Sequence, residues 1–312
     1  MRILLTGASS FTGAWFAAAL AGDGHQVTGT LQRRIGDYAD LEARRITMLQ
    51  SAGVKLVEQA SYGNAVMMEL VSHGFERLCF HASDVRDYRS ADFDLGRALQ
   101  SNLAGMRAAC FAAKAAGTQR LIWTGTVFEP GEARGDRLDE AITLYGLSKW
   151  LTWQALDFYA SEAGLALGKF IVPNPFGPLE QDRFCTYLVR AWANHQAPEV
   201  RTPSYVRDNI PVDKLARAYA DFVALPPQAA GAERCGPSGY AESQGDFTAR
   251  FAREIGARLK LPVPFTLARQ SDFPEPLTRI NLGGAEVQWD EARFWDNLAA
   301  DYAERLLTPP ND

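Results

Sequence analysis

Through the first half of the chain, short apolar runs alternate with longer segments in which apolar residues recur every three or four positions. The short runs are typical of buried strands, and the longer segments are typical of helices with one apolar face. The predicted strands cover residues 3–6, 27–31, 54–58, 78–82 and 121–124. The predicted helices cover residues 12–21, 38–51, 64–72, 95–116 and 147–163. This alternation predicts an α/β fold built from right-handed βαβ units, with a doubly wound parallel sheet and helices on both faces.

The pattern changes from about residue 168 onward. Prolines become frequent, and short strand-like runs alternate with predicted helices at residues 184–195, 213–225 and 245–259. We therefore expect two parts. A sheet domain covers residues 1–170, and a smaller C-terminal lobe covers residues 171–312 and is interleaved with the end of the sheet.

Composition restricts the class of protein. The 312 residues are 47% apolar and carry 32 basic against 37 acidic side chains, a formal net charge of −5. Because this balance gives no overall attraction to nucleic acid or to an anionic membrane, we expect neither as a partner. No apolar run reaches the roughly 18–20 residues that cross a bilayer. Because a strand-like run begins at Arg2, we expect no signal peptide.

Cysteine and histidine usage points to a reducing compartment and to no metal. The four cysteines (Cys79, Cys110, Cys185 and Cys235) contain no CxxC pair, and the first three lie in apolar stretches. This distribution predicts buried free thiols, and we expect a cytoplasmic protein. The four histidines offer no metal-ligand spacing, so His81 is expected to be a structural core residue.

A glycine-bearing turn follows the first predicted strand directly. Gly7 and Gly13 match the outer positions of a G-x-x-G-x-x-G pattern, and Ser10 stands where the middle glycine is expected. A dinucleotide site requires a tight turn here, because the pyrophosphate binds over the N-terminus of the following helix. The turn predicts a Rossmann-type nucleotide site, and the alternative is an ordinary strand–helix turn that happens to contain glycine.

The end of the second predicted strand indicates which nucleotide binds. An NAD site favours Asp or Glu at this edge, where the carboxylate takes the ribose hydroxyls. The sequence instead reads Gln32-Arg33-Arg34, and two arginines can clamp a 2′-phosphate. We therefore expect NADP, and the alternative is a solvated basic turn.

Tyr145 and Lys149 are four residues apart, which places a phenol and an ammonium on one face of a helix. With ten tyrosines and six lysines, about 0.2 such pairs are expected by chance in the chain. A free tyrosine has a pKa of about 10, and a nearby cation lowers it, which yields an acid/base for a carbonyl–alcohol couple. Upstream, Thr124 ends the fifth predicted strand, from which its hydroxyl would project toward a bound substrate. The alternative for Thr124 alone is a strand-end threonine that bonds to the backbone.

In their order along nearly the whole chain, these motifs resemble those of the extended short-chain dehydrogenase/reductases. This family contains the NAD(P)-dependent nucleotide-sugar epimerases, dehydratases and reductases. The resemblance rests on the glycine turn, residues 80–83, residues 102–105, Thr124, Tyr145 with Lys149, residues 173–178 and residues 207–213.

The resemblance implies a role for each matched residue. Tyr145 would be the catalytic acid/base, Lys149 would bind the nicotinamide ribose and lower the pKa of Tyr145, and Thr124 would orient the substrate oxygen. Asn174, Arg207 and Arg279 would hold the diphosphate of a nucleotide sugar. The cofactor would contact Gly7, Ser10, Phe11, Thr12, Gly13, Arg33, Arg34, Ala82, Asn102, Tyr145, Lys149 and Pro173.

One departure from the family bears on the reaction. The 4,6-dehydratases of the family carry an acid just after the catalytic threonine, and here Gly125 and Thr126 occupy those positions. Dehydration is therefore disfavoured. We expect an NADPH-dependent reductase of a nucleotide-linked keto sugar, a 4-keto-6-deoxy sugar above all. The alternatives are a 4-epimerase, a reductase of a non-sugar carbonyl and a silent NADP-binding sensor.

The family also implies an oligomeric state. In its members the helices that correspond to residues 95–116 and 147–163 pair across a two-fold axis. We therefore expect a homodimer.

Overall fold

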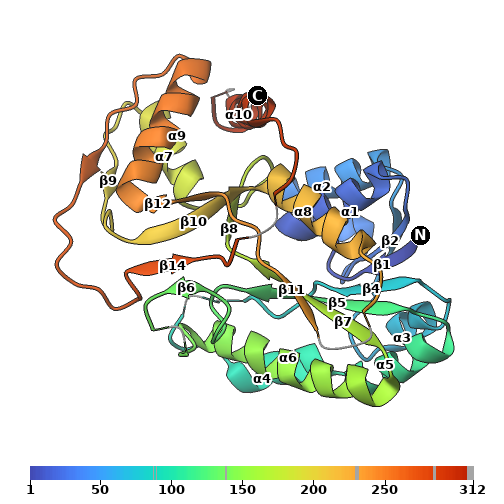
Figure 1. Cartoon of the computed structure of the whole chain (residues 1–312). Coiled ribbons are helices and arrows are strands. Elements are labelled where there is room, and N and C mark those ends of the chain that lie inside the picture. Colours follow the sequence, from blue (N-terminus) through green and yellow to red (C-terminus); the bar gives the residue numbers. More distant parts are fainter. Residues whose placement is uncertain (87, 89, 138, 229–231, 284–285, 308–312) are drawn as a thin grey trace.

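A seven-stranded parallel sheet forms the centre of the fold (Figure 1). The computed structural model describes residues 1–312 except 87, 89, 138, 229–231, 284–285 and 308–312. The strands, in their order across the sheet, are β11 (Glu233–Cys235), β7 (Ala166–Val172), β5 (Arg120–Thr126), β4 (Arg77–Phe80), β1 (Arg2–Leu5), β2 (Gln26–Thr30) and β3 (Lys55–Val57). Strand order reverses beside β1, which creates the switch point where doubly wound sheets bind ligands. The predicted fold class is confirmed.

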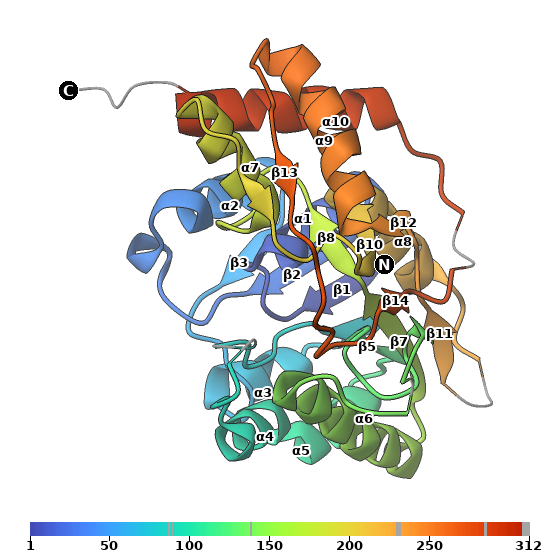
Figure 2. The ribbon, with the colours of Figure 1, turned by 90° about the vertical axis from the view of Figure 1, so that its left-hand side faces the viewer.

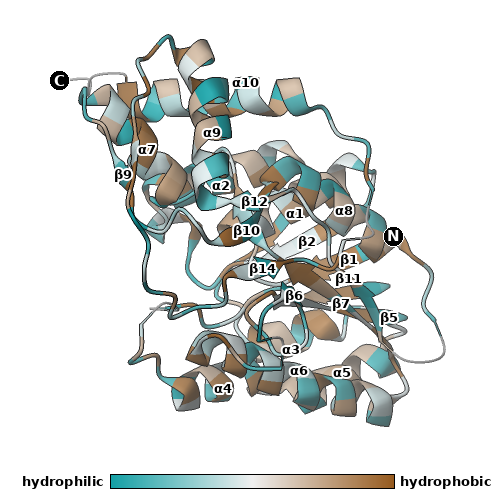
Figure 3. Cartoon of the chain, turned by 60° about the vertical axis from the view of Figure 1, so that its left-hand side comes forward, coloured by the Kyte–Doolittle hydropathy of each residue, from teal (hydrophilic) through white to brown (hydrophobic). Residues whose placement is uncertain are grey.

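Helices cover both faces of this sheet, and each face has its own apolar core. One face carries α1 (Phe11–Gly22), α2 (Asp40–Ser51) and α8 (Val212–Ala224). The other face carries α3 (Ala65–Val71), α4 (Leu95–Leu103), α5 (Met106–Ala115) and α6 (Leu144–Ala163). Figure 2 shows the second group as a layer below the sheet, and Figure 3 shows apolar residues concentrated along the central strands.

The single helix predicted over residues 95–116 is wrong, because the chain forms two helices there. Gly105 separates α4 from α5 with a φ of +64°, a conformation that glycine adopts readily. A Cβ on Gly105 would lie 2.7 Å from the Cα of Gly63, so the break also lets two backbones approach closely. Periodicity alone does not reveal such a break, because the apolar spacing continues across it.

The C-terminal lobe has its own core, formed by α7 (Phe184–Ala193), α9 (Gln244–Leu259) and α10 (Glu291–Tyr302). A second sheet lies between this lobe and the parallel sheet. It contains β12 (Tyr240–Ser243), β10 (Val206–Pro211), β14 (Thr278–Ile280) and β6 (Arg134–Gly135), with β8 (Asn174–Phe176) paired to β10. A two-stranded pair, β9 (Glu199–Val200) and β13 (Thr266–Leu267), completes the lobe.

The two sheets exchange segments of chain. Strand β6 follows β5 in sequence but belongs to the second sheet, and β11 comes from the C-terminal part of the chain but pairs with β7.

Two further sequence expectations can be compared with the fold. Cys79, Cys110 and Cys185 are buried free thiols, as predicted. Among the described residues, no helix is long and apolar enough to cross a membrane.

Candidate active site

A cavity of about 1140 Å³ lies where the carboxyl ends of the sheet strands face the C-terminal lobe. Most of the site residues predicted from the sequence lie in its wall: Gly7, Ser10, Phe11, Thr12, Ala82, Asn102, Thr124, Tyr145, Lys149, Pro173, Asn174, Arg207 and Arg279. Gly13, Arg33 and Arg34 are the predicted site residues that do not line it. No group of three or more metal-binding side chains occurs in the described part of the chain.

The turn between β1 and α1 has the backbone that a dinucleotide requires. Gly7 has a φ of +73°, and a Cβ there would lie 3.0 Å from the Cα of Ala82. A Cβ on Gly13 would lie 2.3 Å from the carbonyl oxygen of Gly7, so Gly13 supports the turn from beneath. Ser10 caps α1 by accepting from the N–H of Gly13 at 3.1 Å, and it donates to the carbonyl of Gly7 at 2.9 Å. The N-terminus of α1 therefore faces the cavity in the manner that binds a pyrophosphate.

His81 connects this turn to Thr124. Its Nε2 lies 3.1 Å from Ser10 Oγ and 3.2 Å from Thr12 Oγ1, and its Nδ1 lies 3.1 Å from Thr124 Oγ1. Burial, assisted by the charge of Lys149, lowers the pKa of His81 to about 3, so the ring is neutral at neutral pH. With its proton on Nδ1, His81 donates to Thr124, whose own proton is then available to a ligand. The sequence indicates only a core histidine, and these contacts show a link between the two halves of the site.

Helix α6 presents Tyr145 in its first turn. Thr143 caps the helix by accepting from the N–H of Gly146 at 3.0 Å. The ring of Tyr145 meets those of Tyr88, Phe93 and Phe128 edge-on, at centroid distances of 5.7, 6.2 and 6.3 Å. Burial among these rings raises the pKa of Tyr145 above its ordinary value, and the negative charge of Glu129 acts in the same direction. The expected lowering of this pKa by Lys149 stays a prediction.

Lys149 is buried one turn further along α6. Its Nζ donates to Ser83 Oγ at 2.8 Å and lies 3.9 Å from the centre of the Trp123 ring. Burial lowers the pKa of Lys149 to about 7; Glu129 acts against this effect and Lys169 adds to it. A small change in the charges around Lys149 would therefore change its protonation near neutral pH.

The basic edge of β2 does not face the cavity as the sequence suggests. The guanidinium of Arg33 pairs with Glu42 of α2, and it stacks on Tyr38 with 4.2 Å between its carbon and the ring centre. Gln32 and Glu42 do line the cavity. A cofactor 2′-phosphate at this edge would therefore meet an arginine that already has a carboxylate partner.

The cavity wall also contains the two arginines predicted to hold a diphosphate. Arg207 donates to Glu275 at 3.0 Å, and Arg279 lies 3.6 Å from the same carboxylate. Both arginines are buried, whereas Glu275 is half-exposed. The side-chain amide nitrogen of Asn174 is buried and has no hydrogen-bond partner among the described residues. These three side chains are donors of the kind that bind an anionic group with several acceptor oxygens.

A model of the NAD dependent epimerase/dehydratase family matches residues 3–230. The chain belongs to this family. It is therefore an NAD(P)-dependent enzyme of the oxidoreductase type, an extended short-chain dehydrogenase/reductase. No curated protein sequence matches the chain.

Solved structures of nucleotide-sugar enzymes share the fold. UDP-glucuronic acid 4-epimerase from Bacillus cereus, in complex with UDP-glucuronic acid and NAD, has 16% identity and a TM-score of 0.75 over 97% of this chain and 99% of that chain. UDP-glucose 4-epimerase from Thermotoga maritima, with UDP-glucose, has 17% identity and a TM-score of 0.72 over 98% and 100% of the two chains. A dTDP-glucose 4,6-dehydratase from Streptomyces venezuelae has 16% identity and a TM-score of 0.73 over 98% of each chain. At these identities the similarity shows the fold alone.

Several residues close to the site do not stand out in the sequence. Arg45 of α2 is buried and donates to the carbonyl of Ser9 at 3.2 Å and to that of Leu179 at 2.9 Å, so it ties the glycine turn to the C-terminal lobe. Glu129 and Lys169 form a buried ion pair behind Gly125. The positions directly after Thr124 in the sequence carry no carboxylate. In the structure the carboxylate of Glu129 lies against Gly125, although Glu129 does not line the cavity.

Proposed function

We propose that the protein is an NADPH-dependent reductase of a nucleotide-linked keto sugar, with a 4-keto-6-deoxy sugar as its substrate. The observation that carries the proposal is that one cavity is lined by Thr124, Tyr145 and Lys149 and also by Arg207 and Arg279. This arrangement supplies an acid/base at one point and donors for a diphosphate at another. Several solved structures with the same fold hold a UDP-sugar.

Each residue has a task in this reaction. When bound, the nicotinamide cofactor supplies a hydride to the carbonyl carbon. Tyr145 holds the proton that the carbonyl oxygen takes up, and its raised pKa keeps it protonated at neutral pH. Thr124, supported by His81, donates a hydrogen bond to the same oxygen. Lys149, which donates to Ser83, would bind the ribose hydroxyls.

A 4-epimerase that retains NAD is the second candidate. Glu42 lies in the cavity wall at the edge of β2, where a carboxylate can accept hydrogen bonds from an NAD ribose. The similar epimerase structure from Bacillus cereus holds NAD. An epimerase returns the hydride to the sugar, so it consumes no cofactor.

A panel of substrates distinguishes the two reactions. The protein would be incubated with NADPH and enzymatically made dTDP-, GDP- and CDP-linked 4-keto-6-deoxy sugars, and in parallel with UDP-hexoses without added cofactor. Loss of NADPH absorbance with one keto sugar, and formation of the 4-hydroxy product, is the expected result. Interconversion of C4 epimers without net loss of NADPH would identify an epimerase. No conversion in either arm would contradict both proposals.

Replacing Arg33 by alanine is expected to weaken NADPH binding about 10- to 100-fold and NADH binding less than threefold. The reason is that a charge-assisted hydrogen bond to the 2′-phosphate contributes about 1.5–3 kcal/mol, and NADH lacks this phosphate. The dissociation constants would be measured by nicotinamide fluorescence or calorimetry.

Glu42→Gln is the matched control, because it removes the carboxylate that pairs with Arg33 in this structure. It is expected to strengthen NADPH binding, since the guanidinium no longer has a competing anion. Equal weakening of NADPH and NADH by Arg33→Ala would remove the argument for NADP.

A further inference from the structure

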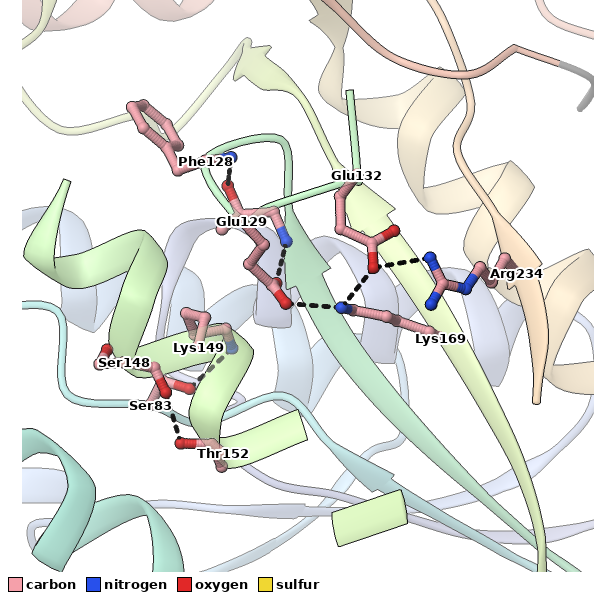
Figure 4. Close-up of polar contacts among 10 residues, drawn as sticks. Ser83, Phe128, Glu129, Glu132, Ser148, Lys149, Thr152, Lys169 and Arg234 are labelled. Carbon is pink, nitrogen blue, oxygen red and sulfur yellow. Dashed lines mark hydrogen bonds and ion pairs between the residues drawn. The ribbon is translucent and has the colours of Figure 1, made fainter. Parts of the chain in front are cut away.

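A group of charged side chains contains the buried Glu129, Glu132 and Lys169 and the exposed Arg234 (Figure 4). Lys169 of β7 is fully buried, and its Nζ donates to Glu129 at 2.5 Å and to Glu132 at 2.7 Å. Glu132 also accepts from Arg234 of β11 at 2.9 Å. None of these four residues lines the cavity, so the group is distinct from the ligand-binding surface.

The carboxylate of Glu129 joins two adjacent strands, the end of β5 and the middle of β7. One oxygen accepts from Lys169 of β7, and the other accepts from the backbone N–H of Thr126 at the end of β5, at 2.8 Å. Gly125 leaves room for this pair, because a Cβ there would lie 2.7 Å from Lys169 Cε and 2.8 Å from Glu129 Oε1. Burying these charges is costly unless they are paired, so the geometry of the pair is strongly constrained.

The segment held by Glu129 also supports Tyr145. The backbone carbonyl of Phe128 packs against the first turn of α6 so closely that a Cβ on Gly146 would lie 2.2 Å from it. The ring of Phe128 lies edge-on to Tyr145, and the guanidinium carbon of Arg279 lies 3.9 Å from the centre of the same ring. A shift of residues 127–132 would therefore move the acid/base and one arginine of the site together.

The same carboxylate interacts electrostatically with two buried lysines. Burial raises the pKa of Glu129, and the charges of Lys169 and Lys149 oppose this shift. Lys149 and Lys169 each lie over a tryptophan ring, Trp123 and Trp153. The titratable groups that act on Lys149 are Glu129, which favours its ammonium form, and Lys169, which disfavours it. The charge of Lys149 in turn helps to lower the pKa of the buried His81.

We propose that Glu129 is a positioning residue: its carboxylate, bonded to Thr126 and Lys169, holds residues 127–132 against Tyr145 and supplies negative charge to the two buried lysines. The tie to catalysis rests on the proposed function, in which Tyr145 transfers the proton. The charge relation between Glu129 and the two lysines does not depend on that function, and it can be tested without any substrate.

Selective ¹⁵N-lysine labelling tests the proposal directly, because the chain has only six lysines. The Nζ resonance of Lys149 would be assigned with Lys149→Arg and followed as a function of pH. Glu129→Gln keeps the size of the side chain and an acceptor for Thr126, but removes the charge. It is expected to lower the pKa of Lys149 by about one unit or more, as loss of a close opposite charge does.

Two variants make the test specific. Glu132→Gln removes a carboxylate from the same Lys169 but not from Thr126, and it is expected to leave the titration of Lys149 within about 0.3 unit. Lys169→Met removes the like charge and is expected to raise the pKa of Lys149. This second shift has the opposite sign, so the proposal stays testable if Glu129→Gln does not fold. A Lys149 titration that neither Glu129→Gln nor Lys169→Met moves would overturn the proposal.

Activity provides a second, separable readout. With any substrate found in the panel, Glu129→Gln is expected to lower kcat about tenfold at pH 7 and to shift the pH profile of kcat to lower pH, with KM for NADPH changed less than threefold. If the NMR titration of Lys149 shifts as expected but no substrate in the panel is converted, only the proposed function is refuted. An unchanged pH profile of kcat in an active Glu129→Gln enzyme would refute the positioning role.

Discussion

Replacing Tyr145 by phenylalanine is expected to lower kcat about 10²- to 10⁴-fold, the usual contribution of a positioned acid/base. The substitution removes only a hydroxyl from a ring held by Tyr88, Phe93 and Phe128, so the packing around it should persist. NADPH affinity should change less than threefold. The measurement is the turnover of the substrate identified in the panel, together with the dissociation constant of NADPH.

The pH dependence of the wild-type enzyme refines this prediction. Because the pKa of Tyr145 is raised, its phenol stays protonated well above neutral pH, and reduction should not decline on its account below pH 10. A decline that begins near pH 7 would instead reflect Lys149, whose pKa is about 7. Tyr159→Phe, near the end of the same helix, is the matched control and should retain wild-type activity. Substantial activity in Tyr145→Phe would assign the proton transfer to another group.

Replacing Gly146 by alanine is expected to cost about 100-fold in kcat and about 1–3 kcal/mol of unfolding free energy. The added Cβ would lie 2.2 Å from the carbonyl oxygen of Phe128 and 2.7 Å from its carbonyl carbon, and both are backbone atoms. Either the first turn of α6 or the segment after β5 must therefore move. Both carry contacts of Tyr145, and a displacement of about 1 Å at a reacting group has effects of this size.

Kinetics and thermal unfolding measured together separate the two effects. Gly22→Ala is the control, because a Cβ at Gly22 meets no atom within 4 Å. It should leave both activity and stability close to those of the wild type. A Gly146→Ala protein with wild-type kcat would show that the close approach of these two segments does not position Tyr145.

Much of the fold can be predicted from the sequence because its signals are local. The apolar runs mark β1 to β5, and Gly7 and Gly13 mark a turn whose φ angle and close contacts the structure bears out. The apolar pattern does not predict which strands pair when the two strands are distant in sequence. Strand β11, three residues long, joins the sheet through β7, and nothing within Glu233–Cys235 indicates this.

The candidate site shows the same limit. The spacing of Tyr145 and Lys149 places them on one helix, and the family motifs place Arg207 and Arg279 in one cavity. The partners of the charged residues could not be predicted in the same way. Nothing in the sequence around Glu129 indicates that it pairs with Lys169, which is 40 residues away. Likewise, nothing around Arg33 indicates that it pairs with Glu42. Burial and long-range pairing decide the pKa values, and periodicity does not report either.

The exchange of strands between the two sheets has a consequence for how the chain folds during synthesis. The outer edge of β7 has no partner until β11 has been made, and β6 has none until β14 has been made. The ribosome therefore releases an N-terminal segment whose sheet has an uncovered edge, the kind of edge that invites aggregation. The wall of the cavity is complete only when Arg279 of β14 has been synthesised and has folded onto β10. Ligand binding therefore requires that these late strands have paired.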